Sequence, residues 1–87
     1  MLGVFVFYVY FLRSLSFPCK KYIGFTKNLK ARLVKHNEGG SPFTARYRPW
    51  KVVTYIGFQT ERGALAFEKY LKTYSGRAYA QKHFWIE

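Results

Sequence analysis

The chain has 87 residues, which is enough for one small domain over 1–87, and 15 Lys and Arg face only 4 acidic residues, for a formal net charge of +11. All four acids are Glu and there is no Asp, which excludes an EF-hand and a two-metal site built from clustered carboxylates. The lone Cys19 excludes an internal disulfide and a cysteine-based zinc finger, and a hydrophobic content of 49% argues against disorder.

The excess of positive charge predicts a nucleic acid as the partner, because phosphate backbones attract Lys and Arg without regard to sequence. Two alternatives stay open: a basic protein without such a partner, and attachment to an anionic membrane. Membrane attachment usually requires a basic amphipathic helix or a lipid signal, and the sequence shows neither, so we expect no membrane partner. Aromatic residues make up 22% of the chain. Most should belong to the core, and some are available to stack on bases.

The first element is an apolar run, MLGVFVFYVYFL over residues 1–12, which is too short to cross a bilayer. A secretory signal would carry positive charge before the run, but here no charge precedes it and Arg13 follows it. Both alternating faces are apolar, a pattern typical of a strand that is buried on both sides. We therefore expect residues 4–13 to form the central strand of a sheet and the protein to be cytoplasmic, with a signal-like segment as the alternative.

The segment 14–19 contains Pro and Ser and is predicted to connect this strand to a second, antiparallel strand over 20–25. A helix is expected over 29–37, because Asn28 or Thr26 can cap its start and Gly39-Gly40 can end it. Its buried stripe is predicted to consist of Leu29, Leu33 and Val34.

The next segment, 38–50, is typical of a long loop, and such loops often carry function. A third strand is expected over 51–58, then a helix over about 61–74 with Thr60 as its N-cap and Ser75-Gly76 as its end. Its apolar positions are predicted to be Leu65, Phe67, Tyr70 and Leu71. A short last helix is expected over 77–86, docked through Trp85 and Ile86. The predicted order is β-β-α-β-α with a further helix at the end.

One internal echo occurs: Tyr22-Ile23-Gly24-Phe25 recurs as Tyr55-Ile56-Gly57-Phe58, and a predicted helix follows each copy. Two copies do not make a solenoid, which needs at least about three repeats. We interpret the echo as chance or as two similar transitions from strand to helix.

Arg32 and His36 are four residues apart in the helix predicted over 29–37, so they share a helix face. An arginine presents a planar fork of donors that suits phosphate, and a histidine can move a proton near neutral pH. The alternative is a solvated arginine and a surface histidine.

Glu68 is the only acid in the body of a predicted element that also carries a buried face. A hard cation such as Mg²⁺ needs oxygen ligands, and one carboxylate with phosphate oxygens and waters can suffice. The alternative is an i,i+4 pair with Lys72, which would contribute about 0.3–0.5 kcal/mol.

Tyr8, Tyr10 and Tyr22 are predicted to lie on adjacent strands, with Tyr8 and Tyr10 on the same strand face. A phenol acts as a base only where nearby cations favour the phenolate, as Arg32 would. The alternative is three core tyrosines whose hydroxyls are satisfied.

Taken in order, these residues form one series: Tyr8-Val9-Tyr10, Tyr22-Ile23-Gly24, Arg32 ten residues after Tyr22, His36-Asn37, Pro49-Trp50 before a strand, and Glu68 inside a helix. The chain thereby resembles the GIY-YIG nuclease domain over about residues 6–80, and it is most similar to the small stand-alone bacterial branch of that superfamily. The similarity is carried by the segments YVYFLRS, YIGFTKNLKARLVKHNEGG, TARYRPWKVV and ALAFEKYLKTYSGR.

The resemblance implies an α+β fold, a three-stranded antiparallel sheet flanked by helices, and an endonuclease that cuts DNA phosphodiester bonds with a single Mg²⁺ or Mn²⁺. It implies that Glu68 holds the metal, that Arg32 contacts the scissile phosphate and that Tyr22 helps to activate the attacking water. Tyr10 and His36 would line the same pocket. DNA is further expected to contact a set of basic residues: Lys27, Lys35, Arg46, Arg48, Lys72 and Arg77.

The chain departs from the family pattern at three positions. Tyr8 stands in place of the first Gly of GIY, and Phe25 and roughly Ala80 stand where some members carry Lys and Asn. Activity is therefore expected to be weak or to depend on a protein partner. Two other functions stay open, a nucleic-acid-binding module without turnover and a small basic structural protein bound to RNA. The copy at 55–58 is not expected to be functional, because Leu65 stands where an Arg would be required.

Overall fold

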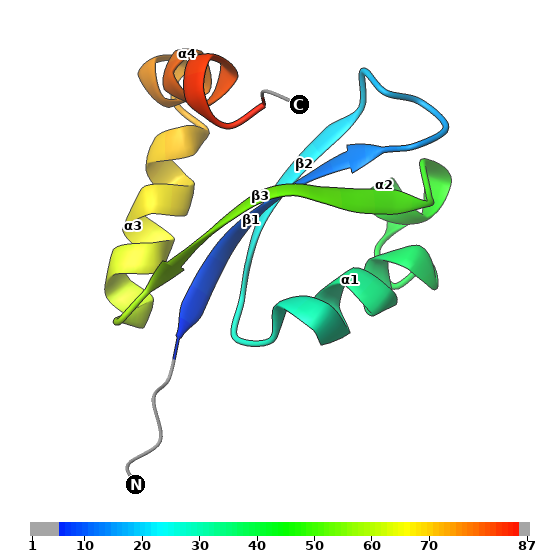
Figure 1. Cartoon of the computed structure of the whole chain (residues 1–87), viewed down its shortest axis with the longest axis horizontal. Coiled ribbons are helices and arrows are strands. Elements are labelled where there is room, and N and C mark those ends of the chain that lie inside the picture. The colour runs from blue at the N-terminus through cyan, green and yellow to red at the C-terminus, as the bar shows by residue number, and fades with distance from the viewer. Residues whose placement is uncertain (1–5, 86–87) are drawn as a thin grey trace, which may run out of the picture.

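Three antiparallel strands form the middle layer of the protein, whose computed structural model describes residues 6–85 (Figure 1). The strands are β1 (Phe7–Ser14), β2 (Lys21–Thr26) and β3 (Trp50–Phe58), in the spatial order β2-β1-β3. The prediction of a central first strand is confirmed. It follows from the apolar side chains on both faces of β1, since residues 9–12 are all buried. Residues 4 and 5 of the predicted strand lie outside the described residues.

Two pairs of helices cover the two faces of this sheet (Figure 1). On one side lie α1 (Leu29–Asn37) and α2 (Pro42–Arg46), and on the other lie α3 (Glu61–Leu71) and α4 (Tyr74–His83). The predicted three-stranded antiparallel sheet flanked by helices is therefore confirmed. Among the residues that the structure describes, no helix has the length and apolar character needed to span a bilayer.

The alternation of side chains along β1 divides the core into two clusters. Val9 and Phe11 pack with Ala64 and Leu71 of α3 beneath the second helix pair. Tyr10 and Leu12 point the other way and pack, beneath α1, with a second group: Tyr22, Leu29, Leu33, Tyr47, Trp50 and Val52. The α1 side of the sheet therefore holds the tyrosines that the sequence singled out.

Helix α1 has the predicted bounds, but its buried stripe differs from the prediction. The Asn28 side chain caps the helix by accepting from the backbone N–H of Ala31. Val34 is exposed, which contradicts its predicted burial. Each residue turns the helix by about 100°, so the stripe that begins at Leu29 and Leu33 continues through His36 and leaves Val34 outside. The buried residue that was not predicted for this stripe is therefore His36, whose side chain is titratable.

The predicted loop over 38–50 is corrected by the short helix α2 inside it. Pro42 lies in the first turn of this helix, where its fixed φ is favourable and its missing N–H costs nothing. Ser41 precedes it in extended backbone, as an N-cap residue should. The segment therefore folds back over the end of α1 and delivers buried Thr44 to the sheet face.

The predicted end of the second long helix is also wrong. Helix α3 ends at Leu71, and Thr73 caps α4 by accepting from the N–H of Gly76. Gly76 thus lies inside α4 and does not break a helix. A Cβ at Gly76 would collide with the carbonyl group of Tyr70, so the glycine permits the tight turn between the two helices.

The burial of apolar side chains in the α3–α4 layer follows the packing of these helices on the sheet. Leu65 and Tyr70, two of the apolar positions named for this helix, are exposed, because the stripe of α3 that faces the sheet passes through Ala64 and Leu71. Trp85 is buried against Phe11, as predicted for the end of the last helix. Ile86, its predicted companion, lies outside the described residues.

Candidate active site

A chain of three polar side chains lies buried between β1, α1 and α2. The Tyr10 hydroxyl lies 2.8 Å from Nε2 of His36, and Nδ1 of the same ring lies 2.8 Å from Oγ1 of Thr44. All three residues are buried, and Tyr10 is only 1% exposed. Each polar atom therefore finds its partner inside the protein, as buried polar groups require.

The direction of these hydrogen bonds follows from the Thr44 hydroxyl, which donates to the carbonyl of Ser41 at 3.4 Å. Its oxygen is then free to accept from His36 Nδ1–H, which leaves Nε2 as the acceptor for the Tyr10 O–H. Burial lowers the pKa of His36, and the positive charges of Arg32 and Lys35 lower it further. The imidazole is therefore neutral at physiological pH.

Tyr10 is held in its protonated form. Burial raises its pKa to about 12, with a further contribution from Tyr22, while Arg32 opposes the shift through its charge and through a side-chain hydrogen bond. Glu68 also raises this pKa, so its carboxylate lies within electrostatic range of the Tyr10 hydroxyl. Residues of β2, α1 and α3 therefore act on one phenol of β1.

Gly24 makes this arrangement sterically feasible. It pairs with Tyr10 across β1 and β2, and the tyrosine ring lies directly over it. A Cβ at this position would collide with the Tyr10 hydroxyl, would lie 2.6 Å from Cζ of that ring, and would also press on Tyr22 at 2.9 Å. The close approach expected at the Gly of the second motif thus has a definite cause.

Tyr22 is the half-buried tyrosine of the group and borders two cavities along the edge of β2. Its ring meets His36 edge-on with 4.9 Å between centroids and lies 6.2 Å from Tyr10. One cavity, of about 160 Å³, is shared with Arg32, Lys35 and His36. The other, of about 480 Å³, is bordered by Leu71, Lys72 and Arg77 of α3 and α4, among others. Tyr22 thus lies between two hollows that are each bordered by arginine and lysine.

Glu68 lies on α3, one turn before Lys72, which borders the second of these cavities. Its side chain is 20% exposed, and Oε2 accepts from Lys72 Nζ at 3.2 Å, so the predicted i,i+4 pair does form. Within residues 6–85, no three His, Cys, Asp or Glu side chains gather closely enough to hold a metal by themselves. The partly exposed carboxylate still fits a hard cation that takes its other ligands from phosphate and water.

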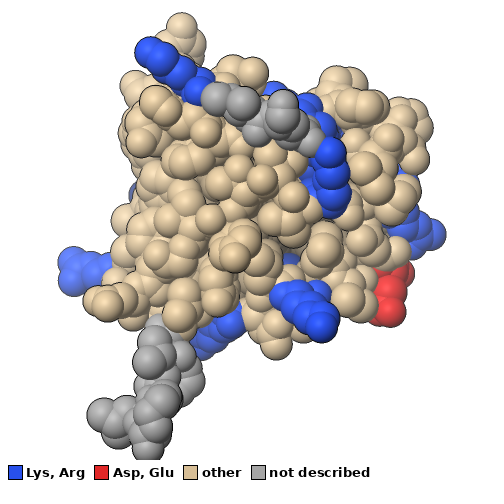
Figure 2. Space-filling view, viewed as in Figure 1, with Lys and Arg blue, Asp and Glu red and all other residues tan. Residues whose placement is uncertain are grey.

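The predicted DNA-contacting residues are spread over the surface. Lys35 borders the small cavity, and Lys72 and Arg77 border the larger one. Arg46 and Arg48 are exposed at and after the end of α2. Lys27 lies apart from them, at a third cavity on the far side of α1. Figure 2 shows Lys and Arg side chains spread over one face of the molecule, with an acidic patch at its edge.

Two members of the site were missed from the sequence, Thr44 and Phe43. Phe43 stacks on Tyr22 with 6.3 Å between ring centroids, and the Thr44 carbonyl accepts from the indole N–H of Trp50 at 2.7 Å. Both residues lie in α2, within the segment predicted to be a loop. The Ser41-Pro42 pair was the available signal, since a polar cap before proline is typical of a helix start.

Comparison with known proteins gives the same picture over almost the whole chain. A family model described as the GIY-YIG catalytic domain matches residues 6–82. The chain is 41% identical over 80 residues to a Giardia intestinalis protein named structure-specific endonuclease subunit SLX1 homolog, a match that covers 87% of this chain and 22% of that protein. A Talaromyces marneffei protein named structure-specific endonuclease subunit slx1 is 45% identical over 65 residues, covering 68% and 17%.

The fold itself recurs in a solved structure. A solution NMR structure of a UPF0213 protein from Bacillus halodurans superposes with a TM-score of 0.52 and 28% sequence identity, covering 88% of this chain and 81% of that one. The curated relatives are much longer than the matched region, since this chain spans only about a fifth of their length.

Proposed function

Because the chain belongs to the GIY-YIG catalytic domain family, we propose that it is an endonuclease that hydrolyses DNA phosphodiester bonds in DNA repair or processing. The observation that carries the proposal is the gathering of Tyr22, Arg32 and His36 around one cavity, with the Glu68 carboxylate in electrostatic range of Tyr10. The names of the relatives, structure-specific endonuclease subunits, support the same activity.

Arg32 is proposed to bind the scissile phosphate. Its guanidinium borders the small cavity beside Lys35, and an arginine fork can engage two phosphate oxygens at once. Phosphodiester hydrolysis builds negative charge on the phosphate oxygens, so a fixed cation at this position stabilises the transition state more than the ground state. The neutral His36 beside it adds no competing positive charge.

Tyr22 is proposed to orient the attacking water and to relay its proton. Of the three candidates, Tyr10 is buried and donates to His36, and His36 uses Nε2 to accept that bond. Tyr22 alone among them borders both cavities, where water and phosphate have access. Tyr10, His36 and Thr44 are then positioning residues that hold the neighbouring ring and Arg32 in place.

The family resemblance implies a divalent metal, and we assign it to Glu68, with Mg²⁺ or Mn²⁺ as the ion. A single carboxylate suits a cation that keeps several waters and shares phosphate oxygens with the substrate. When bound, such an ion supplies Lewis-acid stabilisation of phosphate charge and lowers the pKa of a water. Lys72 holds the Glu68 carboxylate in place through Oε2. Among the described contacts it does not engage Oε1, so the carboxylate can still bind a cation.

The wider setting of this activity follows from the relatives' names. They are called subunits, and we propose that this chain likewise acts with a protein partner. DNA is the proposed substrate, with RNA as the other nucleic acid to be tested. A cytoplasmic location and a place in the stand-alone bacterial branch stay predictions.

A second candidate is a module that binds nucleic acid on this scaffold without turnover. Phe25 and Ala80 favour it, because the two positions at which some family members carry Lys and Asn here pack into the core beneath α3 and α4. Such a module would bind DNA in a salt-dependent manner and release no products.

The decisive experiment is cleavage of a panel of branched, nicked and duplex DNA with Mg²⁺ or Mn²⁺, and with EDTA. We expect metal-dependent products that fall at least about a hundredfold in Glu68→Gln and Arg32→Ala. Glu61→Gln and Arg62→Ala, exposed on the same helix α3, serve as matched controls and should cut like the wild type. Binding without products, or cutting that survives Glu68→Gln, would contradict the proposal.

A further inference from the structure

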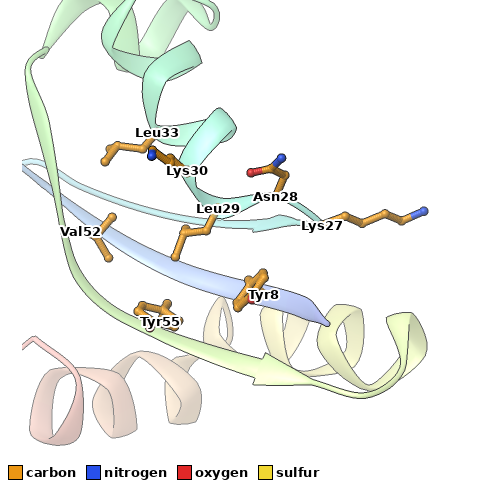
Figure 3. Close-up of a pocket in the computed structure, with 8 residues that line it drawn as sticks. All are labelled: Tyr8, Lys27, Asn28, Leu29, Lys30, Leu33, Val52 and Tyr55. Atoms are coloured by element: carbon orange, nitrogen blue, oxygen red, sulfur yellow. The ribbon is translucent and has the colours of Figure 1, made fainter. Parts of the chain in front are cut away.

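A third cavity, of about 510 Å³, lies between α1 and β3 (Figure 3). Its volume is in the range of small-ligand sites. Leu29 and Leu33 reach into it from α1, and Tyr8, Val52 and Tyr55 come from the strands. None of the roles described so far uses this cavity.

The cavity and the candidate active site lie on opposite sides of α1. With about 100° per residue, Lys30 points toward β3, whereas Arg32 and Lys35 point toward β2. The lining residues agree, since Lys30 borders the third cavity and Arg32 and Lys35 border the small cavity beside Tyr22. The single helix α1 therefore borders both sites, and a strand bound at Arg32 reaches the third cavity by crossing this helix.

An open aromatic surface forms one wall of this cavity. Tyr8 and Tyr55 meet edge to face, with 5.8 Å between centroids and 70° between ring planes. Tyr55 is 56% exposed, so the rest of its ring is available for stacking. Tyr8 pairs with Gly57, where even a Cβ would remain 3.8 Å from the Tyr8 ring. The departure of Tyr8 from the family's Gly therefore supplies an aromatic ring to this wall.

The remaining lining combines an apolar floor with a basic rim. Leu29, Leu33 and Val52 form the floor, and Asn28 and Lys30 border it at the start of α1, whereas Lys27 extends away from the cavity with its ammonium 5.9 Å from the centroid of the Phe7 ring. No acidic residue is among the residues that border the cavity. Apolar and aromatic surface suits a flat ring, and the ammonium group of Lys30 suits a phosphate. A nucleotide combines both features in one ligand.

We propose that this cavity binds one unpaired nucleotide of the strand whose phosphodiester lies at Arg32 and Tyr22. The inference rests on the proposed nuclease function and narrows its substrate to DNA with a single-stranded segment beside the cut. The base stacks on Tyr55 and Tyr8, and Lys30 binds a flanking phosphate. A base within a duplex is stacked and paired on both sides, so it cannot enter the cavity without being extruded.

The test is equilibrium binding, measured in EDTA so that no cutting occurs, with a fluorescent oligothymidylate and with a blunt duplex as probes. Tyr55→Ala should weaken oligothymidylate binding about tenfold, and the loss on the blunt duplex should be at most about twofold. Lys30→Ala should weaken oligothymidylate binding and reduce its salt dependence. Tyr74→Ala and Lys82→Ala on α4 are the matched controls, since Tyr74 is 91% exposed and lies away from the cavity.

Equal losses on both probes, or a Tyr55→Ala protein that binds like Tyr74→Ala, would overturn the proposal. Thermal unfolding checks that each variant is folded, and chemical-shift changes at the rings of Tyr8 and Tyr55 on adding oligothymidylate test the wild type directly. Failure of the nuclease function would show differently, as absence of metal-dependent products from the wild type whatever the binding results.

Discussion

The two copies of Tyr-Ile-Gly-Phe occupy related places in the fold. Residues 22–25 lie in β2 and residues 55–58 in β3, on the two sides of β1, and a helix follows each strand. The glycine of each copy faces a tyrosine of the central strand, Gly24 beside Tyr10 and Gly57 beside Tyr8. The repeated sequence thus corresponds to two strands that pair with β1 in a similar way, one on each side of it.

The two copies differ in what covers them. After β2 the chain returns over the same sheet face, so α1 places His36 against Tyr22 and Arg32 beside it. After β3 the chain crosses to the other face, because α3 packs on Val9 and Phe11. Tyr55 is left open to solvent. The same four residues belong to the candidate active site only where the following helix covers them with charge.

The sharpest way to break this comparison is Tyr22→Phe. Loss of one positioned hydroxyl that handles a proton typically lowers the rate by a factor of 10²–10⁴, and we expect kcat on DNA to fall about a hundredfold. The ring remains, so DNA affinity and thermal stability should stay close to the wild type. Tyr79→Phe on α4 is the control. Unchanged kcat in Tyr22→Phe would mean that the Tyr22 hydroxyl takes no part in the reaction.

The two glycines offer a matched pair for stability. Gly24→Ala forces the Tyr10 ring and hydroxyl to move, and such overpacking costs about 1–3 kcal/mol of unfolding free energy. Gly57 is exposed, and a Cβ there would displace only a methyl group of Val6. Because replacing a glycine in a strand is itself favourable, Gly57→Ala should change the unfolding free energy by less than about 1 kcal/mol.

Urea denaturation of both glycine variants measures the difference, and DNA cleavage by the same samples shows whether Tyr10 has moved. Equal losses of stability in the two variants would show that the crowding over Gly24 is relieved at no cost.

Where the sequence predicted the fold well, the signal was local. The bounds of α1 followed from Asn28, and the central place of β1 followed from its two apolar faces. The misses came from tertiary contacts. Ser75-Gly76 favours a break by propensity, but Gly76 is inside α4 because two helices must turn closely at Tyr70.

The candidate site was predictable to a similar extent. Helix spacing placed Arg32 and His36 together, but it could not show that His36 is buried and bonded to Tyr10. Thr44 could not be found at all, because its role depends on how α2 folds over α1. The family resemblance supplied Glu68 as the metal ligand, whereas spacing alone left a metal ligand and an i,i+4 partner of Lys72 both open.

Thr44 belongs to the site around the copy at residues 22–25, which α1 covers, and not to the open copy at 55–58. Thr44→Val tests its role. The substitution keeps the shape but leaves His36 Nδ1–H without an acceptor, which should lower unfolding free energy by about 1–2 kcal/mol and lower kcat several-fold. Thr44→Ser restores the hydroxyl and should recover both. Nitrogen-15 shifts of the His36 ring in the wild type report the tautomer directly, and a ring that carries its proton on Nε2 would contradict the assignment.

The buried His36 also predicts a pH dependence that the open copy lacks. Burial lowers the pKa of His36 below its unfolded value of about 6.5, so below that pH the unfolded chain binds more protons than the folded one. Unfolding free energy should therefore fall as pH drops below about 6.5, and it should not change with this group above that pH. His36→Gln should flatten this part of the curve in denaturation series at several pH values. A slope that persists in His36→Gln would assign it to another group.

The smallest effect is expected from completing the second copy. Leu65 stands ten residues after Tyr55, as Arg32 does after Tyr22, and Leu65→Arg would give both copies the same spacing. Leu65 is 42% exposed on α3, and α3 lies on the opposite sheet face from Tyr55, so the new guanidinium cannot reach that ring. We expect a stability change within about 0.5 kcal/mol and no recovery of cutting when Leu65→Arg is added to Arg32→Ala. Recovery would show that spacing along the chain, rather than the path of the following helix, decides which copy is active.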